Sequence, residues 1–221
     1  MNSLYLIALE TILCLIFQII IYKKYKTIGL YAYVIVCVIL SCLMSLKTIT
    51  LFNFDINLGI IPFTTIFTAY NILIQKNGEE ISKNLILTMS ATFIISYFIL
   101  YFVQFMSSSN INLFTNASYD NIFIDSARIY FANFVVLLYS LLLNSKLYFY
   151  LKKMKNNILI SNLFSTIIIQ FIAAIIFGLT AYIFVKELID ILKIIMIRYL
   201  MSLVVGILGT ISIYTSNKEK D

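Results

Sequence analysis

Residues 47–84 read KTITLFNFDINLGIIPFTTIFTAYNILIQKNGEEISKN, and a short polar segment here separates two apolar ones. Lys47 closes the first apolar segment. The second ends in two amides, Asn71 and Gln75, before a loop that contains Gly78. On both sides of this stretch the chain is a series of long apolar runs joined by short polar loops. The fold class therefore depends on what surrounds these runs.

The composition indicates that the surroundings are lipid. The chain has 221 residues, of which 62% are hydrophobic and 12% are charged. A soluble domain is about half apolar and about one quarter charged. The apolar surplus is too large for one globular core, so the sequence predicts an integral membrane protein.

The apolar runs predict transmembrane helices. A helix needs about 20 apolar residues to cross a bilayer, and these runs lack the alternating polarity of barrel strands. We count seven of them, at residues 4–22, 28–46, 58–74, 85–106, 127–151, 158–185 and 191–214. The predicted fold class is therefore an all-α integral membrane protein with about seven transmembrane helices.

The loop charges predict an orientation in the cell membrane. Lysines follow the first, third and fifth runs and occur in the C-terminal tail, which together account for much of the net charge of +6. The loop after the fourth run has two aspartates and no basic residue. Lys47, Lys186 and Lys193 are exceptions, because they lie on the same predicted outer side as that loop. Because basic loops remain in the cytoplasm, we expect the N-terminus outside and the C-terminus inside. The positive charge then faces anionic lipid, and no nucleic acid partner is expected.

Several kinds of chemistry are excluded by residue type. The chain has no histidine, which excludes histidine acid–base catalysis and histidine–zinc sites. Its cysteines have no CxxC spacing and read as apolar packing residues: Cys14, Cys37 and Cys42. The spans contain few carboxylates and no nucleophile–base pair. We therefore expect neither an enzyme nor a bound metal or cofactor.

Ionisable residues inside the spans are functional hypotheses, because burying a charge in lipid is costly. Arg128 opens the fifth run and Arg198 lies in the seventh. A guanidinium can hold an anionic or carbonyl-rich ligand with two hydrogen bonds, or it can extend to the lipid headgroups. Glu10, in the first run, fits either an ion pair between helices or proton coupling. Both alternatives stay open for each residue.

The sixth run carries a polar stripe. Asn162, Thr166 and Gln170 recur at every fourth residue, so they share one helix face, with Ser165 beside them. Such a stripe either bonds to a neighbouring helix or lines a polar cavity that suits a hydrogen-bonding heterocycle. Other amides in the runs extend this polar set: Asn71, Gln75, Gln104, Asn133 and Asn144.

Short motifs across residues 27–214 resemble the queuosine-precursor transporter family, also called the vitamin uptake transporter family. The likeness is carried by KTIGLYAYVIV, LKTITLFNFDINLG and FTAYNILIQKNG, by Ala127-Arg128-Ile129, and by the spacing of Asn162, Ser165-Thr166 and Gln170. It implies an extra N-terminal transmembrane helix with a basic loop over residues 1–26. Residues 27–221 would then form a six-helix transporter-like core.

The departures from the family pattern replace acidic residues with neutral ones. Asn71, Gln75 and Asn144 stand where the family pattern has acids, and Ala173 and Gly209 replace aspartates. An amide retains the shape and the hydrogen bonding of a carboxylate but loses its charge. A site built from these residues therefore cannot bind a basic group or a proton as an acid would.

The resemblance implies a membrane transporter for a small metabolite, with uptake of a queuosine precursor of the deazapurine type. Two alternatives are open: the substrate-binding component of an energy-coupling-factor vitamin importer, and a divergent non-transporting binding or assembly protein. The expected partners are a small-molecule substrate and the lipid bilayer, and either a second copy of the chain or importer subunits. The expected substrate-binding residues are Lys47, Asn71, Gln75, Arg128, Asn162, Ser165, Thr166 and Gln170.

Overall fold

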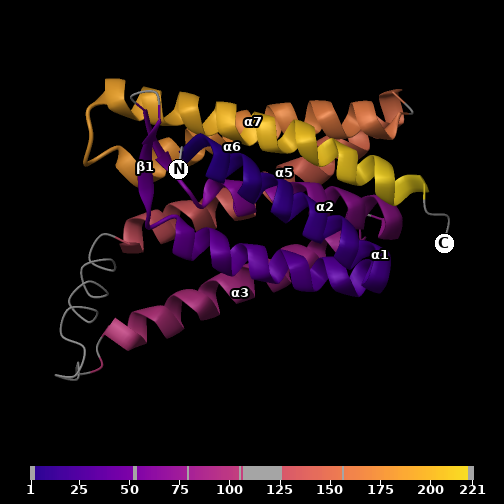
Figure 1. Ribbon diagram of the computed structural model, residues 1–221, viewed down its shortest axis with the longest axis horizontal. Helices are drawn as coiled ribbons and strands as arrows, with labels where there is room; N and C mark the ends of the chain where they lie inside the picture. The colour runs from indigo at the N-terminus through magenta and orange to yellow at the C-terminus, as the bar shows by residue number, and fades with distance from the viewer. Residues whose placement is uncertain are drawn as a thin grey trace.

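The protein is a bundle of long helices (Figure 1). The computed structural model describes residues 3–51, 54–78, 80–104, 106, 126–155 and 157–218. The elements in chain order are α1 (Ser3–Met44), β1 (Thr48–Leu51), β2 (Phe54–Asn57), α2 (Ile60–Asn77), α3 (Glu80–Gln104), α5 (Ser126–Lys155), α6 (Ile158–Tyr182) and α7 (Leu188–Lys218). The predicted all-α membrane class is confirmed, with a small β-hairpin added.

Helix α1 is folded back on itself at Lys26. This residue has φ 50° and ψ −133°, a backbone conformation that non-glycine residues rarely adopt. The two arms, residues 3–25 and 27–44, lie close together, since the Tyr33 hydroxyl donates to the Cys14 carbonyl oxygen at 3.1 Å. A Cβ atom on Gly29 would lie only 2.7 Å from the Ile21 carbonyl oxygen, so this contact requires glycine. The arms match the first two predicted spans.

Five helices in the described part of the chain are long and apolar enough to cross a membrane: α1, α3, α5, α6 and α7. Helix α2, which was predicted as a span at residues 58–74, is not one of them. The count of seven transmembrane helices therefore stays a prediction. The two termini lie at opposite ends of the bundle (Figure 1).

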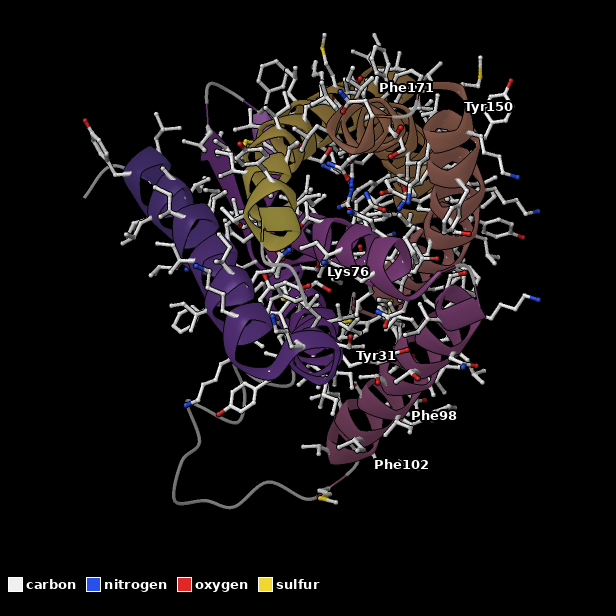
Figure 2. All side chains as sticks on the ribbon, turned by 90° about the vertical axis from the view of Figure 1, so that its right-hand side faces the viewer. Tyr31, Lys76, Phe98, Phe102, Tyr150 and Phe171 are labelled. Carbon is white, nitrogen blue, oxygen red and sulfur yellow. The ribbon has the colours of Figure 1, made fainter. Side chains whose placement is uncertain are left out.

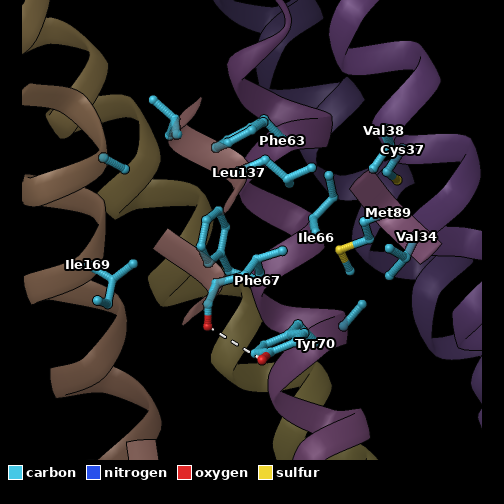
Figure 3. Close-up of a cluster of buried hydrophobic side chains, with 14 of the residues drawn as sticks. Val34, Cys37, Val38, Phe63, Ile66, Phe67, Tyr70, Met89, Leu137 and Ile169 are labelled. Atoms are coloured by element: carbon cyan, nitrogen blue, oxygen red, sulfur yellow. Dashed lines mark hydrogen bonds between the residues drawn. The ribbon is translucent and has the colours of Figure 1, made fainter. Parts of the chain in front are cut away.

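Helix α2 is the core of the bundle. Each of its residues from Ile60 to Ile74 is buried. Figure 3 shows Phe63, Phe67 and Tyr70 of this helix among side chains of the neighbouring helices, such as Met89. A helix that is covered on all sides contacts lipid little, so it can carry polar residues that its neighbours satisfy. This property allows α2 to bring amides into the middle of the protein.

The segment between the second arm of α1 and α2 forms an antiparallel hairpin, with Thr48 opposite Asn57 and Leu51 opposite Phe54. The sequence predicted only a polar segment here. The Asn57 side chain fixes the hairpin to the bundle, because it donates to the Ser45 carbonyl oxygen at 2.7 Å and accepts from the Gly59 amide at 2.9 Å. The hairpin lies at the end of the bundle that holds the N-terminus (Figure 1).

Several basic loops lie at the end of the bundle opposite the hairpin (Figure 1). The end where α1 folds back, the end of α2, the beginning of α3 and the C-terminus lie opposite the hairpin (Figure 1). Figure 2 views the molecule from this end, with Lys76 labelled near the centre. Lys47 and Lys186 lie at the hairpin end, so the separation of basic residues between the two ends is incomplete. The orientation in a membrane stays a prediction.

Candidate functional site

A chain of hydrogen bonds crosses the interior of the bundle and joins four helices. The Asn144 amide nitrogen of α5 donates to the Asn71 side-chain oxygen of α2 at 2.7 Å. The Asn71 amide nitrogen donates to the Asn162 side-chain oxygen of α6. The Asn162 amide nitrogen then donates to the Thr210 hydroxyl of α7 at 3.2 Å. We call these four residues the amide chain, and each of its three asparagines has an exposed fraction of 0%.

Small residues on α7 allow these helices to approach. A Cβ atom on Gly209 would lie 2.2 Å from the Thr68 methyl of α2, and one on Gly206 would lie 2.5 Å from the Thr166 methyl of α6. Close approach through small residues is typical of helix packing in membranes. It places Thr210 within reach of the amide chain.

Around the amide chain, five buried polar atoms have no hydrogen-bond partner among the described residues. They are Ser140 Oγ, Asn144 Oδ1 and Tyr148 OH on α5, and Thr166 Oγ1 and Gln170 Nε2 on α6. Residues 140, 144 and 148 recur at every fourth position, as do 162, 166 and 170, so each set shares one helix face. Figure 2 shows nitrogen and oxygen atoms gathered between α2, α5, α6 and α7.

Native proteins leave few buried polar atoms unpaired, because each one costs free energy. Unpaired atoms on two helix faces are therefore groups for a ligand or for ordered water. We call the amide chain together with Ser140, Tyr148, Thr166 and Gln170 the polar tract. Its donors and acceptors are amides and hydroxyls, which suit an uncharged partner with several hydrogen-bonding groups.

A second polar group lies nearer the hairpin end. Arg198 of α7 donates from Nη2 to the Asn133 side-chain oxygen at 3.3 Å, and Asn133 donates to the Ser45 hydroxyl at 3.0 Å. The guanidinium carbon lies 3.6 Å from the Phe177 ring centroid and 5.5 Å from that of Phe63. We call these five residues the arginine cluster. Arg198 and Thr210 are twelve residues apart on α7, so the cluster lies about 18 Å from the amide chain along that helix.

The structure brings together part of the predicted site. Asn71 and Asn162 bond directly in the amide chain, and Thr166 and Gln170 lie on the same buried face of α6. Ser165 is buried beside them, but its hydroxyl donates to the Asn162 carbonyl oxygen at 3.0 Å within its own helix. Gln75 lies one turn beyond Asn71 and is partly exposed. The role of these residues as substrate ligands stays a prediction.

Lys47 and Arg128 do not join that group. The Lys47 side chain is exposed where β1 begins. Arg128 lies in the first turn of α5, with its guanidinium carbon 5.7 Å from the Tyr182 ring centroid. Glu10 is partly buried and forms no ion pair within the described ranges. The eight predicted residues therefore do not form one compact site.

Several residues of the two polar groups were not predicted as ligands. Ser140, Asn144 and Tyr148 had a signal in the sequence, because they recur at every fourth position of one run. Thr210 matches the family pattern in the last run, but it was not predicted as a ligand. Arg198 was noted for its charge, but its position between two phenylalanine rings is visible only in three dimensions.

A buried tract of hydrogen-bonding groups inside an apolar helical bundle is the kind of site that membrane transporters use. The family comparison agrees with this class. The family described as "Putative vitamin uptake transporter" matches residues 57–216, which is more than half of the chain. The chain therefore belongs to the vitamin uptake transporter family, and the predicted family is confirmed. Neither a curated protein nor a solved structure matched in the other two comparisons.

The matched region begins at the end of the hairpin and includes α2 through most of α7. It thus contains the whole amide chain and the unpaired atoms around it. The resemblance noted in the sequence begins earlier, at residue 27, in the second arm of α1.

Proposed function

We propose that the protein carries a small hydrogen-bonding metabolite across the cell membrane and that its substrate is a deazapurine precursor of queuosine. The observation that supports this is the set of five buried, unpaired polar atoms beside the amide chain. A deazapurine ring presents both donors and acceptors at its edge. Amides and hydroxyls can pair with both kinds of group.

Hydrogen bonding would replace ion pairing in this site. Asn71 and Asn144 stand at positions where the family pattern has acids, and each is fully buried and bonded to the other. The substrate would therefore be held through its neutral edge. Because the polar tract is buried, substrate entry requires the helices to separate, as in alternating access.

Uptake in a host without its own queuosine-precursor transporter tests the proposal. The chain is expressed there at limiting precursor, and the queuosine content of tRNA is measured. Gln170→Leu and Thr166→Val each remove one hydrogen-bonding group, so each should lower uptake at limiting precursor by about fivefold. Thr180→Val is the matched control, because the Thr180 hydroxyl already donates to the Ile176 carbonyl oxygen at 2.6 Å.

A second candidate is a binding or assembly protein that does not transport. It is favoured by the internal pairing of the amide chain, in which Asn71 uses both its nitrogen and its oxygen on neighbouring helices. A membrane-inserted chain that gives no queuosine in tRNA would reject the queuosine precursor as the transported substrate. Thermal stabilisation of that same protein by the precursor would then support the second candidate.

A further inference from the structure

A cavity of about 190 Å³ lies at the hairpin end of the bundle, apart from the polar tract. The hairpin, the end of α6 and the beginning of α7 enclose it. Its polar lining comes from Thr48, Asp55, Asn57, Tyr182, Lys186 and Arg198. No residue of the amide chain is in this lining, so the cavity is a separate place for a ligand.

Arg198 is the buried charge of this cavity. Its exposed fraction is 6%, and Nη2 donates to Asn133, but Nη1 is buried and has no hydrogen-bond partner among the described residues. Arg198 also forms no ion pair within these ranges. Stacking on Phe177 offsets a part of the cost of burying the cation. The remaining cost is one that an anion in the cavity would reduce.

The surroundings of Arg198 are also positive. The Lys186 ammonium and the Arg128 guanidinium each lie 5.7 Å from the Tyr182 ring centroid, and Lys186 lines the cavity. Asp55 is the acidic residue of the lining. It is exposed, and its carboxylate accepts from the Thr50 hydroxyl at 3.0 Å. In the lining itself, two cationic groups, Lys186 and Arg198, accompany one acidic group, Asp55.

We propose that this cavity binds a small oxyanion, a carboxylate or a phosphate, with Arg198 as the buried contact and Lys186 at the mouth. A guanidinium matches the geometry of both groups, because its N–H bonds can pair with two oxygens at once. The cavity is smaller than the roughly 300–1,000 Å³ of pockets for drug-sized ligands. It therefore takes a small anion, or the acidic end of a larger solute. This inference does not depend on the substrate proposed above.

Thermal unfolding of the full-length protein in lipid nanodiscs tests the site. Benzoate and phosphate are titrated at constant ionic strength, with benzamide as the neutral counterpart of benzoate. We expect a saturable rise in Tm with benzoate or with phosphate and none with benzamide. A rise with benzoate alone identifies the ligand as a carboxylate, and a rise with phosphate alone identifies it as a phosphate. An equal rise with benzamide, or no saturable rise with either anion, overturns the proposal.

Two lysine variants provide the matched comparison. Lys186→Gln should weaken anion affinity about two- to fivefold, because Lys186 is an exposed charge at the mouth. Lys153→Gln removes the same charge from an exposed position at the end of α5 farthest from Arg128, and it should have no effect. Equal weakening by both variants would show a general charge effect and would contradict the site.

Arg198 variants give the largest expected change. Arg198→Gln should weaken anion affinity by more than about tenfold, and Arg198→Lys should retain part of it. If Arg198→Gln does not fold, the comparison of Lys186→Gln with Lys153→Gln decides the question. Unchanged affinity in a folded Arg198→Gln protein overturns the proposal.

Discussion

The amide chain and the arginine cluster are both buried between helices. They differ in how far their hydrogen-bonding groups and charges find partners within the protein. In the amide chain, neutral donors meet neutral acceptors across α5, α2, α6 and α7. In the arginine cluster, a full positive charge has amide and ring neighbours and no counter-charge among the described residues. The first can hold helices together without a ligand. The second is the place where we propose that an anion supplies the missing counter-charge.

This difference is the basis of the two proposals above: a neutral ligand at the polar tract and an anion beside Arg198. Three of the positions where the family pattern has acids are amides here, Asn71, Gln75 and Asn144, and they lie in or near the amide chain. The intramembrane positive charge lies nearer the hairpin end, at Arg198 and Arg128. Four substitutions test whether the two regions really differ in this way, and they follow from the largest expected change in stability to the smallest.

Asn71→Leu should have the largest effect. It leaves the Asn144 nitrogen and the Asn162 oxygen buried without their partner, which should lower the free energy of unfolding by about 2–3 kcal/mol. Denaturant titration of the purified protein in detergent measures this change. Asn84→Leu, at an exposed position of α3, is the control and should change stability little. Equal effects of the two variants would mean that the amide chain adds nothing to stability.

Gly209→Ala should lower the free energy of unfolding by about 1–2 kcal/mol, because the new methyl would overlap the Thr68 methyl. Thr68→Ser removes that methyl and retains the hydroxyl, which donates to the Gln18 side-chain oxygen at 2.9 Å. The double variant should therefore recover much of the loss in the same denaturant titration. A double variant no more stable than Gly209→Ala would contradict close packing at this position.

Arg198→Met should change the free energy of unfolding by no more than about 1 kcal/mol. The variant loses the stacking on Phe177 and the bond to Asn133, but it also removes an uncompensated buried charge. Denaturant titration beside Asn71→Leu makes the comparison direct. A loss as large as that of Asn71→Leu would show that the arginine cluster is itself a structural unit.

Gln170→Leu should have the smallest effect on stability, within about 0.5 kcal/mol of the wild type, because Gln170 Nε2 has no partner to lose in the part of the chain that the structure describes. The same variant should lower uptake. Thermal unfolding and the tRNA queuosine measurement on one preparation separate the two effects. A clear loss of stability would place Gln170 among the packing residues and not among the ligands.

The sequence predicted the class of the fold, because the apolar composition and the length of the apolar runs depend directly on whether water or lipid surrounds the chain. It also predicted that α6 has one polar face, because helical spacing determines which residues share a face. It did not predict the hairpin at residues 48–57. Thr48–Leu51 and Phe54–Asn57 each alternate polar and apolar residues, but four residues is the shortest run in which alternation indicates a strand. Asn57 anchors the hairpin through contacts with residues on both sides.

The candidate site was predictable only in part. Asn71 and Asn162 were selected from their residue type and from the family pattern, and the structure places them in direct contact. Lys47 was selected in the same way and lies exposed at the hairpin. Which residues meet depends on how α5, α6 and α7 pack around α2. That packing depends on close contacts, such as Gly209 against Thr68, that no single run reveals.

The burial of α2 has a consequence for biosynthesis. Helix α2 is not among the helices that are apolar and long enough to cross a membrane by themselves, and it carries Asn71 and three threonines. Its partner α7 is synthesised last, more than 100 residues later. While the chain emerges, α2 must be retained in the membrane by the second arm of α1 and by α3. The nascent protein thus has an incomplete core until its last helix is inserted, and a chain that stops before α7 would expose α2 to lipid and to quality-control proteases.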